Sequence, residues 1–136
     1  MNDLNTQLTF NKILGLAGSS PAKAPPESAL QVWFNKIADT PLVSFSDGDL
    51  SRACRQGLFP EHIVPICVAR LAGNPTAGEL FNGELAESLK GIPMAYWHTH
   101  EREKQMCLSL ISRAEEATDD ETQSELAYVS SLIQAS

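Results

Sequence analysis

The sequence predicts an all-α fold, a single compact domain of five or six helices, on three observations. Apolar residues recur at steps of three and four through most of the chain after residue 26, a spacing that places them on one helix face. Serine, asparagine, threonine or proline precedes these stretches, and glycine or proline follows them, as at helix starts and stops. Strand signals are scarce, and residues 42–45 (LVSF) are the only compact candidate. With 136 residues, 43% of them hydrophobic, the chain can bury its core without a metal or a disulfide.

Residues 1–26 are expected to lie outside the compact domain, as an N-terminal segment followed by a flexible linker. Residues 15–26 (GLAGSSPAKAPP) have the composition of turns and linkers. The helical domain is therefore expected to span residues 27–136. Its first helix lies in residues 27–38, where Trp33 and Phe34 belong to an apolar stripe.

Two more helices are expected before residue 74. Ser46 stands three residues before Asp49, as in a capping box, and predicts a helix that Gly57 stops. The next runs over residues 60–73, and Pro65 inside it should kink it or split off a first turn.

The C-terminal part carries three further helical patterns. Asn74 and Pro75 resemble a cap and a first-turn proline, and predict a helix that ends at residue 91. The longest expected helix covers residues 94–116. Thr118 and Glu121 then form a second capping box before a stripe of apolar residues.

The charge is distributed unevenly along the chain. Residues 1–78 contain six acids and six bases, and residues 79–136 contain eleven acids and four bases, so the net charge of −7 comes from the C-terminal part. Such a surface repels nucleic acid and anionic membranes and attracts a basic protein. The alternative is a solvated acidic face that only keeps the protein soluble.

The three cysteines and the N-terminus indicate a cytoplasmic protein. Cys54, Cys67 and Cys107 are odd in number, lack CxxC spacing and have apolar neighbours, so buried free thiols are expected. No basic region followed by a long apolar run begins the chain, and no stretch is long enough to span a membrane.

The stretch YWHTHERE (residues 96–103) suggests metal chemistry, which its spacing does not support. Residues two apart on a helix point about 200° from each other, so His98 and His100 could not share an ion there. On a strand the HxH spacing is similar to the JAMM metalloprotease pattern, but the expected serine and aspartate positions hold Leu108 and Ile111. We predict no metal site. A metal-dependent hydrolase that uses the two histidines remains a rival hypothesis.

No other constellation predicts catalysis, a cofactor or a phosphate cradle. His62 has no nearby nucleophile, and the carboxylates at expected helix starts complement the helix dipole. The protein is therefore predicted not to be an enzyme. Gly78 and Gly83 lie in an otherwise helical pattern, where glycine is unfavourable. They suggest close approach of another backbone, from the same core or from a partner.

Residues 47–97 resemble the contact-dependent growth inhibition (CDI) immunity proteins of Gram-negative bacteria. The resemblance rests on five short motifs in order, which are CRQ-x-LF (54–59), VP (64–65), P-x-A-G-E-L (75–80), GEL (83–85) and IP…YW (92–97). It implies a small cytosolic antidote that binds the toxic C-terminal domain of a partner delivered by neighbouring cells and blocks it by occlusion. Toxins of such systems are often nucleases with basic grooves, which an acidic antidote suits. Arg52, Arg55 and Gln56 could tie helices together or meet an acidic toxin patch, and the structural role is favoured.

The predicted function is therefore neutralisation of a cognate toxin, with a free monomer forming a 1:1 heterodimer. Carboxylates would steer the toxin in, and an apolar or aromatic centre would hold it. A helical adaptor without a toxin partner is the remaining alternative. The expected toxin contacts are Asp47, Asp49, Glu79, Glu84 and Glu87.

Overall fold

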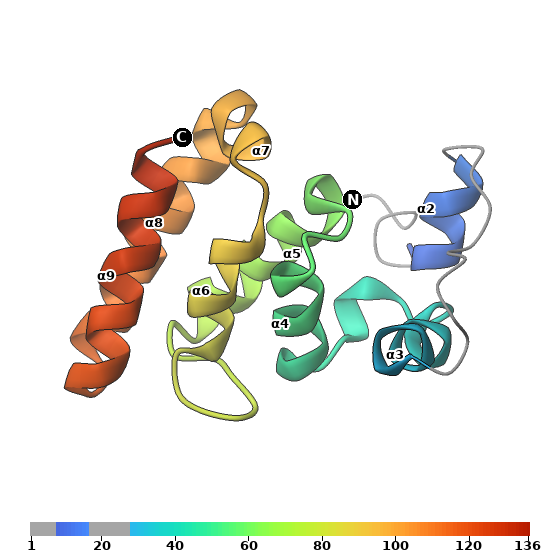
Figure 1. Ribbon diagram of the computed structural model, residues 1–136, viewed down its shortest axis with the longest axis horizontal. Coiled ribbons are helices and arrows are strands. Elements are labelled where there is room, and N and C mark those ends of the chain that lie inside the picture. Colours follow the sequence, from blue (N-terminus) through green and yellow to red (C-terminus); the bar gives the residue numbers. More distant parts are fainter. Residues whose placement is uncertain (1–7, 17–27) are drawn as a thin grey trace. The chain divides into compact units, whose positions relative to one another are not determined.

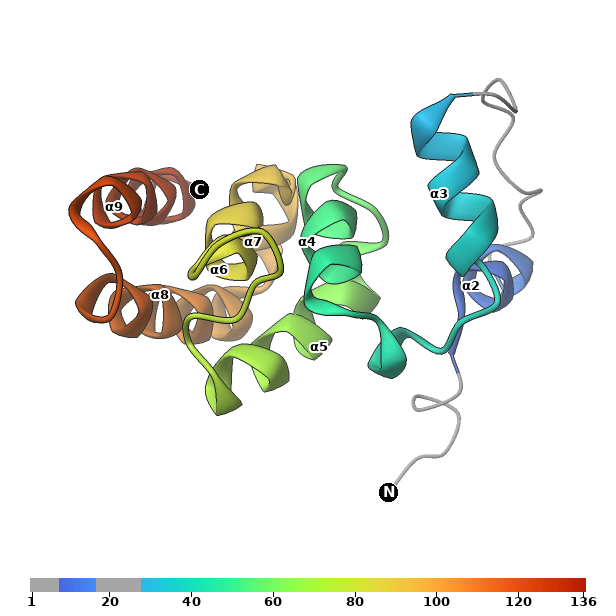
Figure 2. The same cartoon turned by 90° about the horizontal axis from the view of Figure 1, so that it is seen from below.

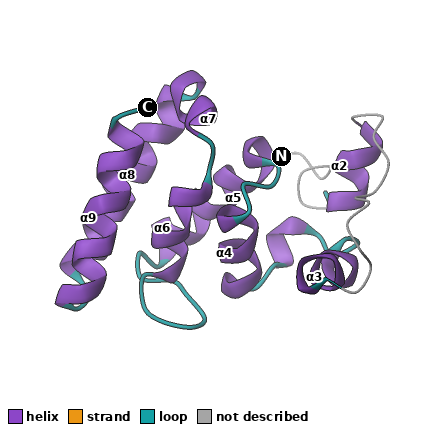
Figure 3. Ribbon diagram, in the orientation of Figure 1, coloured by secondary structure: helices purple, strands orange, loops and turns teal. Residues whose placement is uncertain are grey.

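The computed structural model describes residues 8–16 and 28–136, and these residues form helices and loops without a strand (Figure 1, Figure 3). The predicted all-α class is confirmed. The predicted number of five or six helices is wrong, because the described residues contain eight α-helices and two 3₁₀ helices. The chain divides into two compact units, residues 1–45 and residues 46–136.

The described part of the first unit packs around an aromatic cluster. It contains α2 (Phe10–Leu16), α3 (Ala29–Ile37) and the 3₁₀ helix η1 (Leu42–Ser44). The ring of Phe10 stacks on Phe34 with centroids 5.0 Å apart, and meets Trp33 and Phe45 edge to face. Residues 42–45, the only candidate for a strand in the sequence, do not form one. Short-range bonds such as Ser44 N–H to the Pro41 carbonyl make a helical turn there instead.

The expected linker lies almost entirely on residues 17–27, outside the described residues, so the boundary at residue 27 stays a prediction. The helix expected first in the domain is present as α3. Ser28 caps it by accepting a hydrogen bond from the backbone N–H of Gln31 at 3.1 Å. By its contacts α3 belongs with the first unit.

The second unit is built from six α-helices and one 3₁₀ helix within residues 46–136. The helices of residues 101–116 and 120–134 lie side by side and pack closely (Figure 2). The helix of residues 60–73 packs on the first of these two and on the helix of residues 47–55. The elements are α4 (Asp47–Arg55), α5 (Pro60–Gly73), α6 (Glu84–Ser88), η2 (Leu89–Gly91), α7 (Met94–Thr99), α8 (Glu101–Glu116) and α9 (Asp120–Gln134).

Several predicted starts and stops of these helices are confirmed. Ser46 caps α4 by accepting from the N–H of Asp49 at 3.1 Å, and Gly57 takes a left-handed conformation (φ 65°) just past its end. Pro65 lies inside α5, which continues through it. The cap of α9 lies one residue after the predicted one, because the side chain of Asp119, rather than that of Thr118, accepts a hydrogen bond from the backbone N–H of Thr122.

The two other expected helices are interrupted. The break in the second of them adds one α-helix to the expected six, and α2, which lies in the N-terminal segment expected outside the helical domain, adds the other. Residues 74–83 form a loop instead of a helix, and α6 begins only after Gly83, whose φ of 93° is incompatible with a right-handed helix. The expected helix 94–116 breaks at His100, whose backbone (φ −129°, ψ 64°) ends α7 and starts α8.

The core of the second unit is apolar and contains the three cysteines. All three are buried free thiols, as predicted, and the sulfur atoms of Cys54 and Cys67 lie 3.4 Å apart. Among the described helices, none combines the length and the apolar character that a membrane span requires. The largest fully buried side chains of the unit are those of Leu50, Ile63, Leu71, Leu85, Leu89, Trp97, Ile111, Leu126 and Ile133.

Candidate functional site

The second unit carries the charge of the chain. Residues 46–136 contain 14 acids and seven bases, whereas residues 1–45 contain three of each, so the net charge of −7 lies on the second unit. A negative potential of this kind reaches into solvent and favours a basic partner. The candidate site is therefore sought among the carboxylates of this unit.

One carboxylate, that of Glu84, lies inside the unit and holds the loop 74–83. Its side chain is 1% exposed. Its Oε1 accepts from the backbone N–H groups of Glu79 at 2.8 Å and Leu80 at 3.0 Å, and its Oε2 pairs with Arg55 at 3.2 Å. The ion pair ties α4 to α6, which confirms for Arg55 the structural role expected of the arginine cluster. The loop is thus fixed by a buried anion at its own end.

The pKa of Glu84 reflects this environment. Burial by itself raises the pKa, because it disfavours the charged form. The hydrogen bonds from the N–H groups of Leu80 and Glu79 and from Arg55 outweigh burial and hold the pKa of Glu84 below its ordinary value. Glu84 is therefore ionised at neutral pH.

The tip of the anchored loop exposes two large apolar side chains. Leu80 is 76% exposed and Phe81 is 45% exposed. The turn behind them is tight, because a side chain on Gly78 would collide with the carbonyl oxygen of Phe81. A close approach was expected at Gly78, but it occurs within the loop and not between two helices.

A first group of carboxylates lies on one side of this tip, at the start of α4. Asp47 and Asp49 are in the first turn, and Asp47 pairs with Arg70 at 2.8 Å. A Cβ built on Gly48 would lie 2.5 Å from Oε1 of Glu79, so the Glu79 carboxylate rests against the same turn. The structure thus brings together three of the five predicted contacts. We call Asp47, Asp49 and Glu79 the α4 group.

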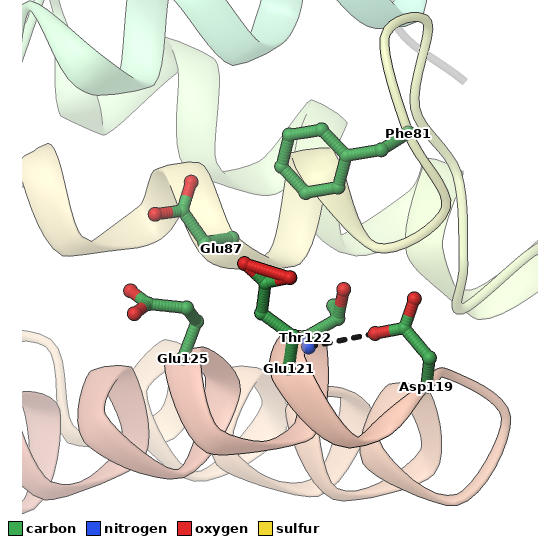
Figure 4. A pocket seen from close by; sticks show the side chains of 6 residues that line it. All are labelled: Phe81, Glu87, Asp119, Glu121, Thr122 and Glu125. Atoms are coloured by element: carbon green, nitrogen blue, oxygen red, sulfur yellow. Dashed lines mark hydrogen bonds between the residues drawn. The ribbon is translucent and has the colours of Figure 1, made fainter.

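A second group surrounds a hollow of about 390 Å³ between the loop, α6 and α9 (Figure 4). Phe81 forms one side of the hollow, Glu87 reaches it from α6, and the other carboxylates reach it from the start of α9. Glu87 is mostly buried and pairs with Lys90. The backbone and side-chain hydrogen bonds of Thr122 hold the pKa of Asp119 below its ordinary value. The four carboxylates of this hollow group are those of Glu87, Asp119, Glu121 and Glu125.

The five predicted contacts are thus separated into three places. Asp47, Asp49 and Glu79 are on the surface around α4, Glu87 is in the hollow, and Glu84 is buried between them. Glu84 and Glu87 both lie on α6, but they differ in access, because the loop covers the Glu84 carboxylate.

Sequence reasoning missed the acids of α9 and the apolar tip. The acids at the start of α9 have only helix-start roles in the sequence analysis, as part of a capping box or as complements of the helix dipole, and nothing in their spacing indicates that Glu87 lies opposite Asp119 and Glu121. Leu80 and Phe81 lie in a stretch that the sequence predicts to be helical. The available signal was the pair Gly78 and Gly83, which bracket them.

The two histidines of the YWHTHERE stretch are placed differently from each other. His98 is exposed in the last turn of α7. His100 stacks on the ring of Tyr96 with centroids 4.0 Å apart, and its Nδ1–H donates to the Tyr96 carbonyl at 2.8 Å. His100 thus closes the junction between α7 and α8. Within the described residues, no group of three or more histidine, cysteine or acidic side chains is placed to hold a metal.

Comparison with known proteins identifies one family. Residues 17–107 match the family model of the CDI immunity proteins, which is more than half of the chain. The match includes α4, the loop with its anchor and the apolar tip, and ends within α8. No curated protein matches the chain.

Proposed function

Because the chain belongs to the family of CDI immunity proteins, we propose that it binds the toxic C-terminal domain of a CDI partner and neutralises it. The complex is a 1:1 heterodimer, formed in the cytoplasm by an antidote that is monomeric when free. Neutralisation is steric, with no bond made or broken. The toxin covers part of the second unit and loses access to its own substrate.

The concentration of carboxylates on the second unit is the observation that supports this proposal most. The α4 group and the hollow group lie on either side of an exposed apolar tip. An acidic surface of this kind steers a basic domain into encounter and raises the association rate. Nucleases need positive surfaces to bind their phosphate-rich substrates. We therefore propose that the toxin is a nuclease and that the antidote competes for its basic groove.

Four of the predicted acids are proposed as contacts. Asp47, Asp49, Glu79 and Glu87 reach the surface or the hollow. Glu84 has no exposed surface while the loop keeps this conformation, so we assign it the role of shaping the contact surface. The acids at the rim of such a surface act mainly on the association rate, and the apolar centre acts on the lifetime of the complex.

The proposal is tested with the toxic domain encoded by the neighbouring large gene. Cells that express this domain alone should stop growing, and co-expression of the 136-residue chain should restore growth. The two purified proteins should elute together as a 1:1 complex. A toxic domain from an unrelated CDI system serves as the control and should neither bind nor be neutralised. Absence of both binding and protection with the cognate domain would refute the proposal.

A further inference from the structure

We propose that the tip formed by Leu80 and Phe81 is the centre of the binding surface, and that it enters an apolar recess of the partner that is ringed by arginine or lysine side chains. This inference rests on the proposed function and specifies the chemistry of the partner. Three features of the loop carry it: its rigidity, its exposed apolar area and the charge on both of its sides.

The loop is preorganised. The carboxylate of Glu84 fixes the two N–H groups that immediately precede and begin the tip, at 2.8 Å and 3.0 Å. Gly83 N–H donates to the Thr76 carbonyl at 2.9 Å and closes the loop at its base. A loop held in one conformation loses little entropy when it binds, so more of its contact energy becomes affinity.

The tip presents apolar area that the fold does not use. Leu80 and Phe81 are adjacent in the chain and are 76% and 45% exposed, although the unit has an extensive apolar core. Single exposed apolar residues are common, but two neighbouring ones on an anchored loop indicate a contact surface. Phenylalanine and leucine each lose substantial unfavourable hydration when a partner covers them. Aromatic anchors of this kind fill the central pockets of protein interfaces.

The charges around the tip determine what can cover it. The α4 group lies against the N-terminal side, through Glu79 and Gly48, and the hollow group lies against Phe81. An apolar centre with acidic surroundings matches an apolar recess with basic surroundings. It does not match a nucleic acid or an anionic bilayer, both of which would bring phosphates up to these carboxylates. The occupant is therefore a basic protein surface.

The test compares tip variants with matched variants elsewhere on the second unit. The double variant Leu80→Ala, Phe81→Ala should weaken binding of the cognate toxic domain by about 30-fold or more, mainly through faster dissociation. Met106→Ala removes an apolar side chain that is also exposed, at 39%, and should leave the dissociation constant within about threefold. Far-ultraviolet circular dichroism and urea unfolding confirm that the variants are folded.

The charge component has its own variant. Glu121→Lys with Glu125→Lys inverts two carboxylates of the hollow, and should lower the association rate at low salt by about tenfold, with a smaller effect at high salt. As a direct measurement of contact, a photo-crosslinking amino acid at position 81 should capture the toxic domain, whereas the same group at position 106 should not.

The outcomes separate this inference from the proposed function. If the wild-type chain neither binds nor protects, the proposed function fails. The wild-type chain can also bind and protect while the folded tip variant binds as tightly as the Met106→Ala control and position 81 does not crosslink. In that case the tip is not the centre of the binding surface, and only the present inference fails.

Discussion

The buried carboxylate of Glu84 yields the most specific prediction about stability. Glu84→Ala leaves the N–H groups of Glu79 and Leu80 without their acceptor and removes the partner of Arg55. An amide without an acceptor costs about 1–3 kcal/mol when it is fully buried. Both amides belong to exposed residues that can reach water in part, and the Arg55 side chain is 36% exposed. The free-energy cost for each amide therefore lies at the lower end of this range, and the cost of leaving Arg55 unpaired is small as well. The expected loss in the free energy of unfolding is about 2–4 kcal/mol.

Urea unfolding measured by tryptophan fluorescence gives this quantity. The chain has two tryptophans, and Trp33→Phe leaves Trp97, buried in the second unit, as the reporter. Glu84→Gln keeps an acceptor oxygen and should cost about 1–2 kcal/mol, because neutral hydrogen bonds are weaker than charged ones. Glu116→Gln, at an exposed position, is the matched control and should stay within about 0.5 kcal/mol of the wild type.

The same residue predicts a pH dependence with a defined sign. The pKa of Glu84 is lowered in the folded protein from the ordinary value of 4.5, so its ionised form stabilises the fold above that value, and the contribution is lost as the pH falls through the folded pKa. The difference in the free energy of unfolding between the wild type and Glu84→Gln should be largest at neutral pH and should vanish in acid. A Glu84→Ala variant as stable as the Glu116→Gln control, or a pH-independent difference, would refute the role assigned to this carboxylate.

Three further predictions concern the packing and the thiols of the second unit. Gly91→Ala should lower the free energy of unfolding by about 2 kcal/mol or more in the same urea assay, because the new Cβ would lie 2.6 Å from Arg55 Cα. Gly73→Ala is the control: a Cβ there meets nothing within 4 Å, so the variant should be as stable as the wild type or slightly more stable. Ser46→Ala should cost about 1 kcal/mol by removing the cap of α4, and Ser46→Asn, which can cap, should cost less than half of that; equal losses would contradict the capping role. The buried thiols should react with Ellman's reagent only on unfolding, since burial raises the pKa of Cys107 to about 12; rapid reaction of the folded protein would show that they are accessible.

The sequence predicted those helices whose signals are local. The apolar stripes and caps of α3, α4, α5 and α9 place these elements within one or two residues of the expected positions. The overall charge and its C-terminal location also follow directly from composition. Spacing and capping depend on neighbouring residues, which is why a single sequence reveals them.

The loop and its anchor depend on tertiary contacts and were not predicted. Residues 78–85 (GELFNGEL) have helix-compatible spacing, but the Glu84 carboxylate bonds to the N–H groups of Glu79 and Leu80 and so competes with the helix. The pairing with Arg55, 29 residues away, has no signature in the local pattern. The break at His100 is similar, because it depends on how the imidazole stacks on Tyr96.

The candidate site was predicted in part. Its acidic character was expected, and so were the three acids of the α4 group as single residues, but not their proximity to one another. An apolar centre was expected without a location. Leu80 and Phe81 could not be identified as that centre, because exposed and buried apolar residues look alike in a periodic pattern. The hollow group joins α6 and α9, and a contact between elements far apart in the chain cannot be read from spacing.

The central claim is that this chain acts by covering a basic toxin, and the salt dependence of their binding tests it most directly. Association of the purified chain with the toxic domain of the neighbouring gene should give a 1:1 complex of nanomolar affinity, and the association rate should fall steeply as salt screens the carboxylates. Failure of the two proteins to associate, or an association rate that does not change with salt, would contradict the account.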